Sequence, residues 1–105
     1  MLALRYLRFD ASEDADGVIT LEALASTPLA NPATHAAVLA EVQQVLGWAW
    51  LQFPHSHGPL DEGQDWDHDL QVTVEGGQWH AVSLTLAASP RFAAAFHATF
   101  GAAPD

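Results

Sequence analysis

The sequence contains no cysteine and no lysine, and its three arginines are outnumbered by thirteen acidic residues, for a formal net charge of −10. Without cysteine there is no disulfide, no thiol nucleophile and no cysteine-ligated zinc. Without lysine there is no lysine Schiff base. Nucleic acids and anionic membrane surfaces are held mainly by Lys and Arg, so the charge argues against both as partners. The negative net charge favours a basic protein as a partner instead.

Long hydrophobic runs and catalytic motifs are also missing. The first ten residues, MLALRYLRFD, are interrupted by Arg5 and Arg8 and fit neither a signal peptide nor a membrane span, which predicts a cytoplasmic protein. We find no GxSxG, no phosphate loop and no dinucleotide-binding glycine pattern, so the sequence lends no support to an enzyme. Richness in Ala, Trp and His without Lys suggests a GC-rich bacterial genome.

The remaining composition is that of a folded chain: 105 residues, 50% hydrophobic and 15% charged. It predicts a single domain over residues 1–105. In the second half, Asp69–Glu75 and Ala81–Leu86 alternate apolar and polar residues, which is typical of half-buried strands. Gly76 and Gly77 between them indicate a hairpin.

The register of this hairpin can also be predicted. A three-residue loop, Glu75–Gly77, pairs Val72 with His80 and Leu70 with Val82, and it places all the aliphatic side chains on one face. A two-residue loop would split them between the two faces, so we prefer the longer loop.

Helix signals complete both halves. Ser89 is a good N-cap for a helix, and phenylalanines recur every four residues from Phe92 to Phe100. Gly101 follows and favours the end of this helix. In the first half, Leu4–Phe9 and Val18–Leu24 resemble strands, and Asn31-Pro32 opens a helix that we expect to reach about Phe53. The predicted fold is therefore α+β, ββαββα, an antiparallel four-stranded sheet with two helices on one face. Its two ββα halves, 1–53 and 66–101, are joined by an acidic loop, 54–65.

The stretch SEDADGVITLEAL, residues 12–24, alternates acids before a glycine, as calcium-binding loops do. An EF-hand loop needs an Asp at its first position and a Glu at its last, and alignment on Gly17 places Ser12 and Ala23 there. We therefore predict an acidic hairpin loop, Asp10–Gly17. Asp14 and Asp16 remain candidates for weak calcium binding.

The loop and the start of the next strand carry several imidazole and carboxylate groups, which are ligands for zinc and other divalent cations. These residues are His55, His57, Asp61, Glu62, Asp65, Asp67, His68 and Asp69. We take four of them as candidate metal ligands: His55, His57, Asp65 and Asp67. No metalloenzyme spacing accompanies them, and a solvated acidic loop explains the same pattern. No cofactor is expected beyond such a divalent cation.

The first helix is unusual because Glu41 is its only charged residue. One side of it is an aliphatic stripe for the core, and the opposite side is small, uncharged and partly aromatic. That side packs either under the second helix or against a second subunit. In the second case we expect a homodimer interface that includes Trp48, Leu51, Gln44 and Trp66.

Three functions remain open from the sequence. The leading hypothesis is a non-catalytic protein-interaction module that self-associates. The second is a divalent-metal-binding protein that uses the acidic and histidine-containing loops. The third is an acidic inhibitor or immunity-type protein that binds a basic partner.

Overall fold

The computed structural model describes residues 3–101, so the ends of the predicted domain, residues 1–2 and 102–105, lie outside the described residues. The elements follow the order β1 (Asp10–Glu13), β2 (Ile19–Pro28), α1 (Pro32–Gln52), a 3-10 turn (Leu60–Glu62), β3 (Trp66–Glu75), β4 (Trp79–Ala88) and α2 (Pro90–Phe100). The predicted α+β fold, ββαββα, is confirmed.

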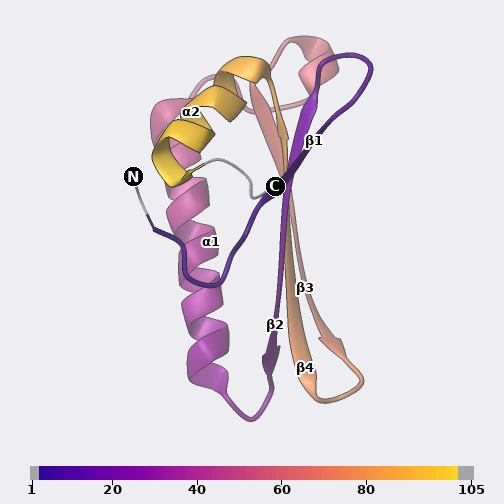
Figure 1. Ribbon diagram of the computed structural model, residues 1–105, viewed down its shortest axis with the longest axis vertical. Coiled ribbons are helices and arrows are strands. Elements are labelled where there is room, and N and C mark those ends of the chain that lie inside the picture. Colours follow the sequence, from indigo (N-terminus) through magenta and orange to yellow (C-terminus); the bar gives the residue numbers. More distant parts are fainter. Residues whose placement is uncertain (1–2, 102–105) are drawn as a thin grey trace.

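The four strands form one antiparallel sheet in the order β1-β2-β4-β3. Both helices lie on the same face of this sheet, and the other face is open (Figure 1). The helices pack on the central strands, β2 and β4. The core therefore lies between these two strands and the helices, and it includes the fully buried Leu21, Leu84, Val42 and Phe92.

Local hydrogen bonds explain where the helices begin. The side chain of Asn31 accepts a bond from the Thr34 amide, and Pro32 occupies the first turn of α1. The side chain of Ser89 accepts a bond from the Phe92 amide in the same way at the start of α2. Both bonds satisfy amides that lack a partner inside the helix, and proline loses nothing in a first turn. The predicted starts of both helices are thus confirmed.

The register of the β3–β4 hairpin differs from the prediction by two residues. Val72 lies opposite Val82 rather than His80, and Leu70 lies opposite Leu84. Gly76 and Gly77 both have positive φ, 59° and 69°, so both belong to the turn, and Gln78 completes the three-residue loop. A shift of two residues preserves the face of every side chain, so the prediction that the aliphatic residues share one face holds.

The prediction of a strand at Leu4–Phe9 is wrong. The first strand of the sheet is β1, and residues 4–9 run across α1 before reaching it (Figure 1). The carboxylate of Glu41 accepts hydrogen bonds from the backbone amides of Arg5, Tyr6 and Leu7, at 2.8 to 3.2 Å. A helix side chain thus satisfies the backbone groups that a neighbouring strand would otherwise bind.

Within residues 3–101, no helix combines the length and the hydropathy that crossing a bilayer requires.

Candidate functional site

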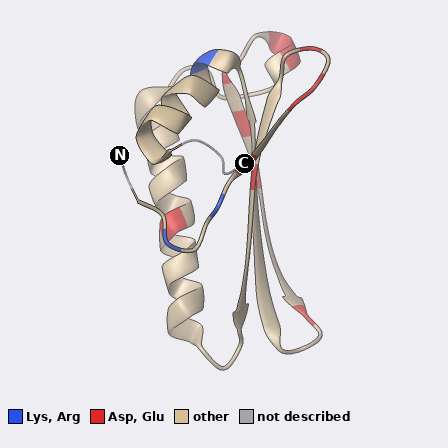
Figure 2. Ribbon diagram, viewed as in Figure 1, with Lys and Arg blue, Asp and Glu red and all other residues tan. Residues whose placement is uncertain are grey.

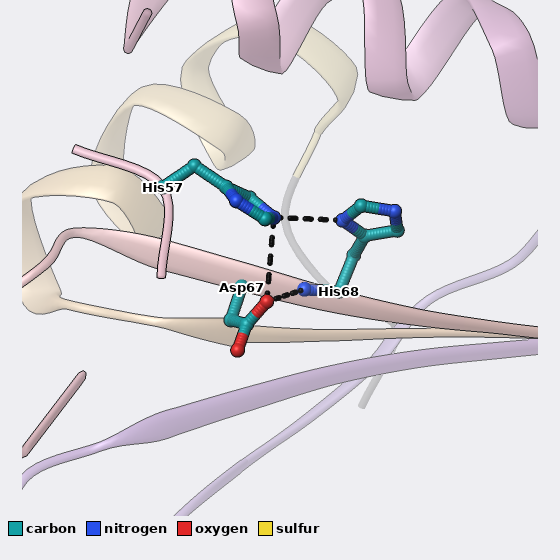
Figure 3. Close-up of side chains that lie close together, drawn as sticks. All are labelled: His57, Asp67 and His68. Carbon is teal, nitrogen blue, oxygen red and sulfur yellow. Dashed lines mark hydrogen bonds and ion pairs between the residues drawn. The ribbon is translucent and has the colours of Figure 1, made fainter. Parts of the chain in front are cut away.

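Two imidazoles and one carboxylate converge at the outer edge of β3. Nε2 of His57 lies 2.9 Å from Nδ1 of His68 and 3.3 Å from Oδ1 of Asp67 (Figure 3). One ligand atom from each of the three side chains lies within 4.8 Å of the others. All three residues are partly buried. The cluster therefore sits at the surface with access to solvent.

The loop before β3 brings His57 to this place. Residues 56–58 double back beside the start of β3, where His57 and Trp66 form a parallel bridge. The carbonyl of Ser56 accepts bonds from the amides of Asp65 and Trp66, and the Gly58 amide donates to the Trp66 carbonyl at 2.9 Å. Gly58 has a φ of 150°, and a Cβ there would lie 3.1 Å from the Gln64 side chain. Only glycine fits this turn without strain.

Strand geometry positions the other two ligands. His68 lies opposite Leu86 and points to the face of the sheet that the helices cover. Asp67 leaves the strand on the other side, and its carboxylate lies at the strand edge, where Oδ1 also accepts the His68 amide at 2.9 Å. Because successive side chains point to opposite faces, two adjacent residues can meet a third group only at an edge. The third group is His57, from the loop.

Two tryptophan rings pack against the His57 imidazole of this cluster. The ring centroids of Trp50 and Trp66 each lie 4.5 Å from that of His57. Trp66 is fully buried and donates its indole N–H to the carbonyl of Phe53 at 3.0 Å. These contacts restrict the orientation of the His57 ring.

The distances suit either a hydrogen-bonded pair of histidines or a metal centre. Two ligands of a tetrahedral zinc ion lie about 3.4 Å apart, because each zinc–ligand bond is about 2.1 Å long. The two separations at His57, 2.9 and 3.3 Å, are both shorter than this value, by about half and about a tenth of an ångström. A shift of the imidazole by a few tenths of an ångström would therefore admit the ion.

The structure brings together only two of the four candidate ligands that the sequence suggested in this region. His57 and Asp67 belong to the cluster, whereas His55 is exposed and lies outside it. The third member, His68, was not among the four. The alternation of β3 places it beside Leu70 and Val72, but only the fold shows that the loop returns to meet it.

Asp65 serves a different purpose. Its carboxylate accepts a hydrogen bond from the Ser89 hydroxyl at 2.8 Å and pairs with the Arg91 guanidinium. The hydrogen bond from Arg91 is the largest cause that lowers the pKa of Asp65 from 3.8 to about 2, with help from Ser89 and Ser56 and against partial desolvation. Asp65 thus fastens the loop to the first turn of α2, where a helix favours negative charge.

We expect Asp65→Asn to destabilise the protein at pH 7 by about 1 kcal/mol, a value reduced for the exposure of Arg91. The carboxylate has a lower pKa in the folded protein than in the unfolded chain, so its contribution is complete above about pH 4. It should disappear as the pH falls from 3.8 toward 2. Urea unfolding at several pH values measures both effects. Asp61→Asn, an exposed change in the same loop, should alter neither.

The acidic hairpin contains one structural carboxylate. Oδ1 of Asp14 accepts hydrogen bonds from the amides of Asp16 and Val18, both at 2.9 Å. The loop is shorter than predicted, because Asp10–Glu13 forms β1 and pairs with β2. Asp14 therefore closes the turn as Asp commonly does. Calcium binding by Asp14 and Asp16 remains untested.

The residues expected at a homodimer interface divide into two groups. Trp66 is fully buried, and Trp48 packs against Phe92 and Phe100 of α2, with ring centroids 5.4 Å apart in both pairs. Trp66 presents no free surface to a second subunit, and Trp48 is partly buried under α2. Leu51 and Gln44 are exposed on α1. The homodimer itself stays a prediction.

No protein-family model, no curated protein and no solved structure matches this chain.

Proposed function

We propose that the protein binds a divalent transition-metal ion through His57, Asp67 and His68. The observation that carries this proposal is the convergence of three ligand atoms within 4.8 Å at one strand edge. The loop and the aromatic rings that support His57 hold the site largely preformed. A preformed site binds a metal more tightly, because little conformational entropy is lost on binding.

The ligand types select the class of metal. Two imidazole nitrogens and one carboxylate suit zinc and its neighbours cobalt, nickel and copper. Calcium and magnesium prefer six or more oxygen ligands, which this cluster does not offer. Three protein ligands leave a fourth position of a tetrahedral ion for water or for a group from another molecule.

Titration with zinc and with cobalt tests the proposal directly. We expect one equivalent to bind the wild type with micromolar or tighter affinity, and cobalt to give the visible spectrum of a nitrogen- and oxygen-ligated ion. His57→Ala and His68→Ala should each weaken binding by at least about tenfold, because each removes one of three ligands. His55→Ala should bind as the wild type does, since His55 lies two residues away but outside the cluster.

Two results would contradict metal binding at this site. One is a wild type that takes up neither ion at millimolar concentrations. The other is an equal loss in the His55 and His57 variants, because it would indicate adventitious binding by the loop rather than by the cluster.

A second candidate function is that of a protein-interaction module that self-associates. The observation that favours it lies on α1, whose exposed positions are all Pro, Ala, Gln, Gly, Trp or Leu. A helix facing water usually carries charged residues on its outer side. A basic partner is the alternative occupant, and the net charge of −10 supports it.

A further inference from the structure

The inner face of β3 is buried at Trp66 but only partly covered toward the hairpin. Leu70, Val72 and Val74 point to the same face of the sheet as Leu84 and Val82, which are buried. We call Leu70, Val72 and Val74 the β3 strip. The helices pack on β2 and β4, so exposure along the strip rises from 36% at Leu70 to 47% at Val72 and 56% at Val74. Alternate apolar residues on a strand normally mark a buried face.

The helix α1 also exposes large apolar side chains. Trp50 is 44% exposed and Leu51 77% exposed on this helix. Glu41 is the single charged residue of α1, and its carboxylate is already bonded to the amides of residues 5–7. Figure 2 shows α1 almost free of charge along its length, while the acidic residues gather mainly in the loops at one end of the molecule. We call the exposed side of α1, centred on Gly47, the uncharged face.

The charges next to the strip argue against a basic occupant. Asp69 and Glu75 flank it in sequence, but they pair with Thr85 and Trp79 and therefore point to the opposite face of the sheet. The partner that complements the strip is a neutral, apolar surface, because a charged group placed there would lose its water without gaining a counter-charge. The chain itself exposes such a surface on α1.

We propose that a second copy of this chain occupies the strip, in a two-fold dimer where the uncharged face of each α1 lies on the β3 strip of the other. A two-fold dimer makes every such contact twice, so both surfaces become covered together. The uncharged face is the exposed side of α1, whereas the buried residues Val38, Val42, Val45 and Ala49 lie on the side that packs on its own sheet. Gly47 and the alanines of this face allow a close approach, since a Cβ at Gly47 meets nothing within the chain.

The available area and the charge permit such a dimer. A standard interface buries about 800 Å² on each partner, which is roughly an eighth of the 6187 Å² surface of the chain. The helix is 21 residues long, about 30 Å, and the strip from Leu70 to Val74 spans about 13 Å, so the helix is long enough to cover it. Two chains of charge −10 repel each other, but physiological salt screens exposed charges beyond about 8 Å.

Three variants test this interface by sedimentation equilibrium. Val72→Glu and Gly47→Glu each place a carboxylate in the proposed contact, and each should raise the dimer dissociation constant roughly 100-fold. Thr73→Glu adds the same charge to the same strand on the opposite face, and it should remain dimeric. Circular dichroism checks that each variant is folded. Gly47→Glu is especially informative, because glutamate favours the helix more than glycine does.

Each result of these measurements either supports or overturns the proposed dimer. A wild-type dimer that tightens with added salt, together with the expected order of the variants, supports the proposal. A wild type that stays monomeric up to millimolar concentration overturns it. So does a pattern in which Val72→Glu and Thr73→Glu both dissociate while Gly47→Glu does not, because that pattern indicates pairing of β3 edges. A dimer that weakens with salt also overturns it, since charge pairing would then hold the copies together.

Discussion

Replacing Trp48 with glutamate is expected to remove a large part of the protein's folding stability, to the same extent at any protein concentration. The indole packs edge-to-face against Phe92, Phe96 and Phe100 of α2, at ring centroid distances of 5.4 to 6.0 Å. It also contacts Phe53 at the end of α1. The substitution removes these contacts and leaves a carboxylate among aromatic rings, at a cost of about 5 kcal/mol. A domain of this size is stable by only about 5 to 15 kcal/mol.

Circular dichroism and urea unfolding at two protein concentrations measure this effect. Leu51→Glu is the matched control, because Leu51 lies three residues along the same helix and is exposed. We expect that variant to keep its helical signal and most of its stability. A Trp48→Glu variant as stable as the wild type would contradict the packing of α1 against α2 through this aromatic cluster.

Glu41→Ala is expected to release the N-terminal segment from the body of the protein. The carboxylate accepts bonds from three backbone amides, those of Arg5, Tyr6 and Leu7, and alanine leaves them all without a partner. Hydrogen bonds to a charged group contribute about 1.5 to 3 kcal/mol each, so the loss should be about 3 kcal/mol after the freed amides regain water. The segment also places the buried Leu7 and Phe9 in the core.

Trypsin measures this release directly. The chain contains no lysine, so trypsin can cut only after Arg5, Arg8 and Arg91. In the wild type the first two sites lie in the fastened segment, and we expect Glu41→Ala to be cut there at least about tenfold faster under native conditions. Glu22→Ala, a change on the open face of the sheet, should leave the rate unchanged. Equal rates in Glu41→Ala and the wild type would show that the core contacts alone hold the segment.

The element order could be predicted because its signals are local. The proline-containing caps at Asn31 and Ser89 specify helix starts through bonds that span three residues. Alternation specifies β3 and β4 in the same way. The hairpin register was missed by two residues, because the side chains keep the same face in either register and only the glycine conformations distinguish them.

Non-local contacts could not be predicted. The segment Leu4–Phe9 has the composition of a strand, but a glutamate 34 to 36 residues away binds its amides. The side of α1 that carries Trp48 was expected to pack under the second helix or against a second subunit, and in the structure α2 covers part of the ring. Sequence pattern shows that a helix face must be covered, but it does not show by which element.

The sequence alone therefore determined the α+β class, the ββαββα order of the elements and the presence of a histidine- and acid-rich segment before β3. Only the tertiary structure decided which of those ligands meet. His57 and His68 are eleven residues apart, and they converge because the loop turns back at Gly58 to lie beside β3. Secondary structure follows from interactions within a few residues, whereas a site at a strand edge depends on how distant backbone groups pair.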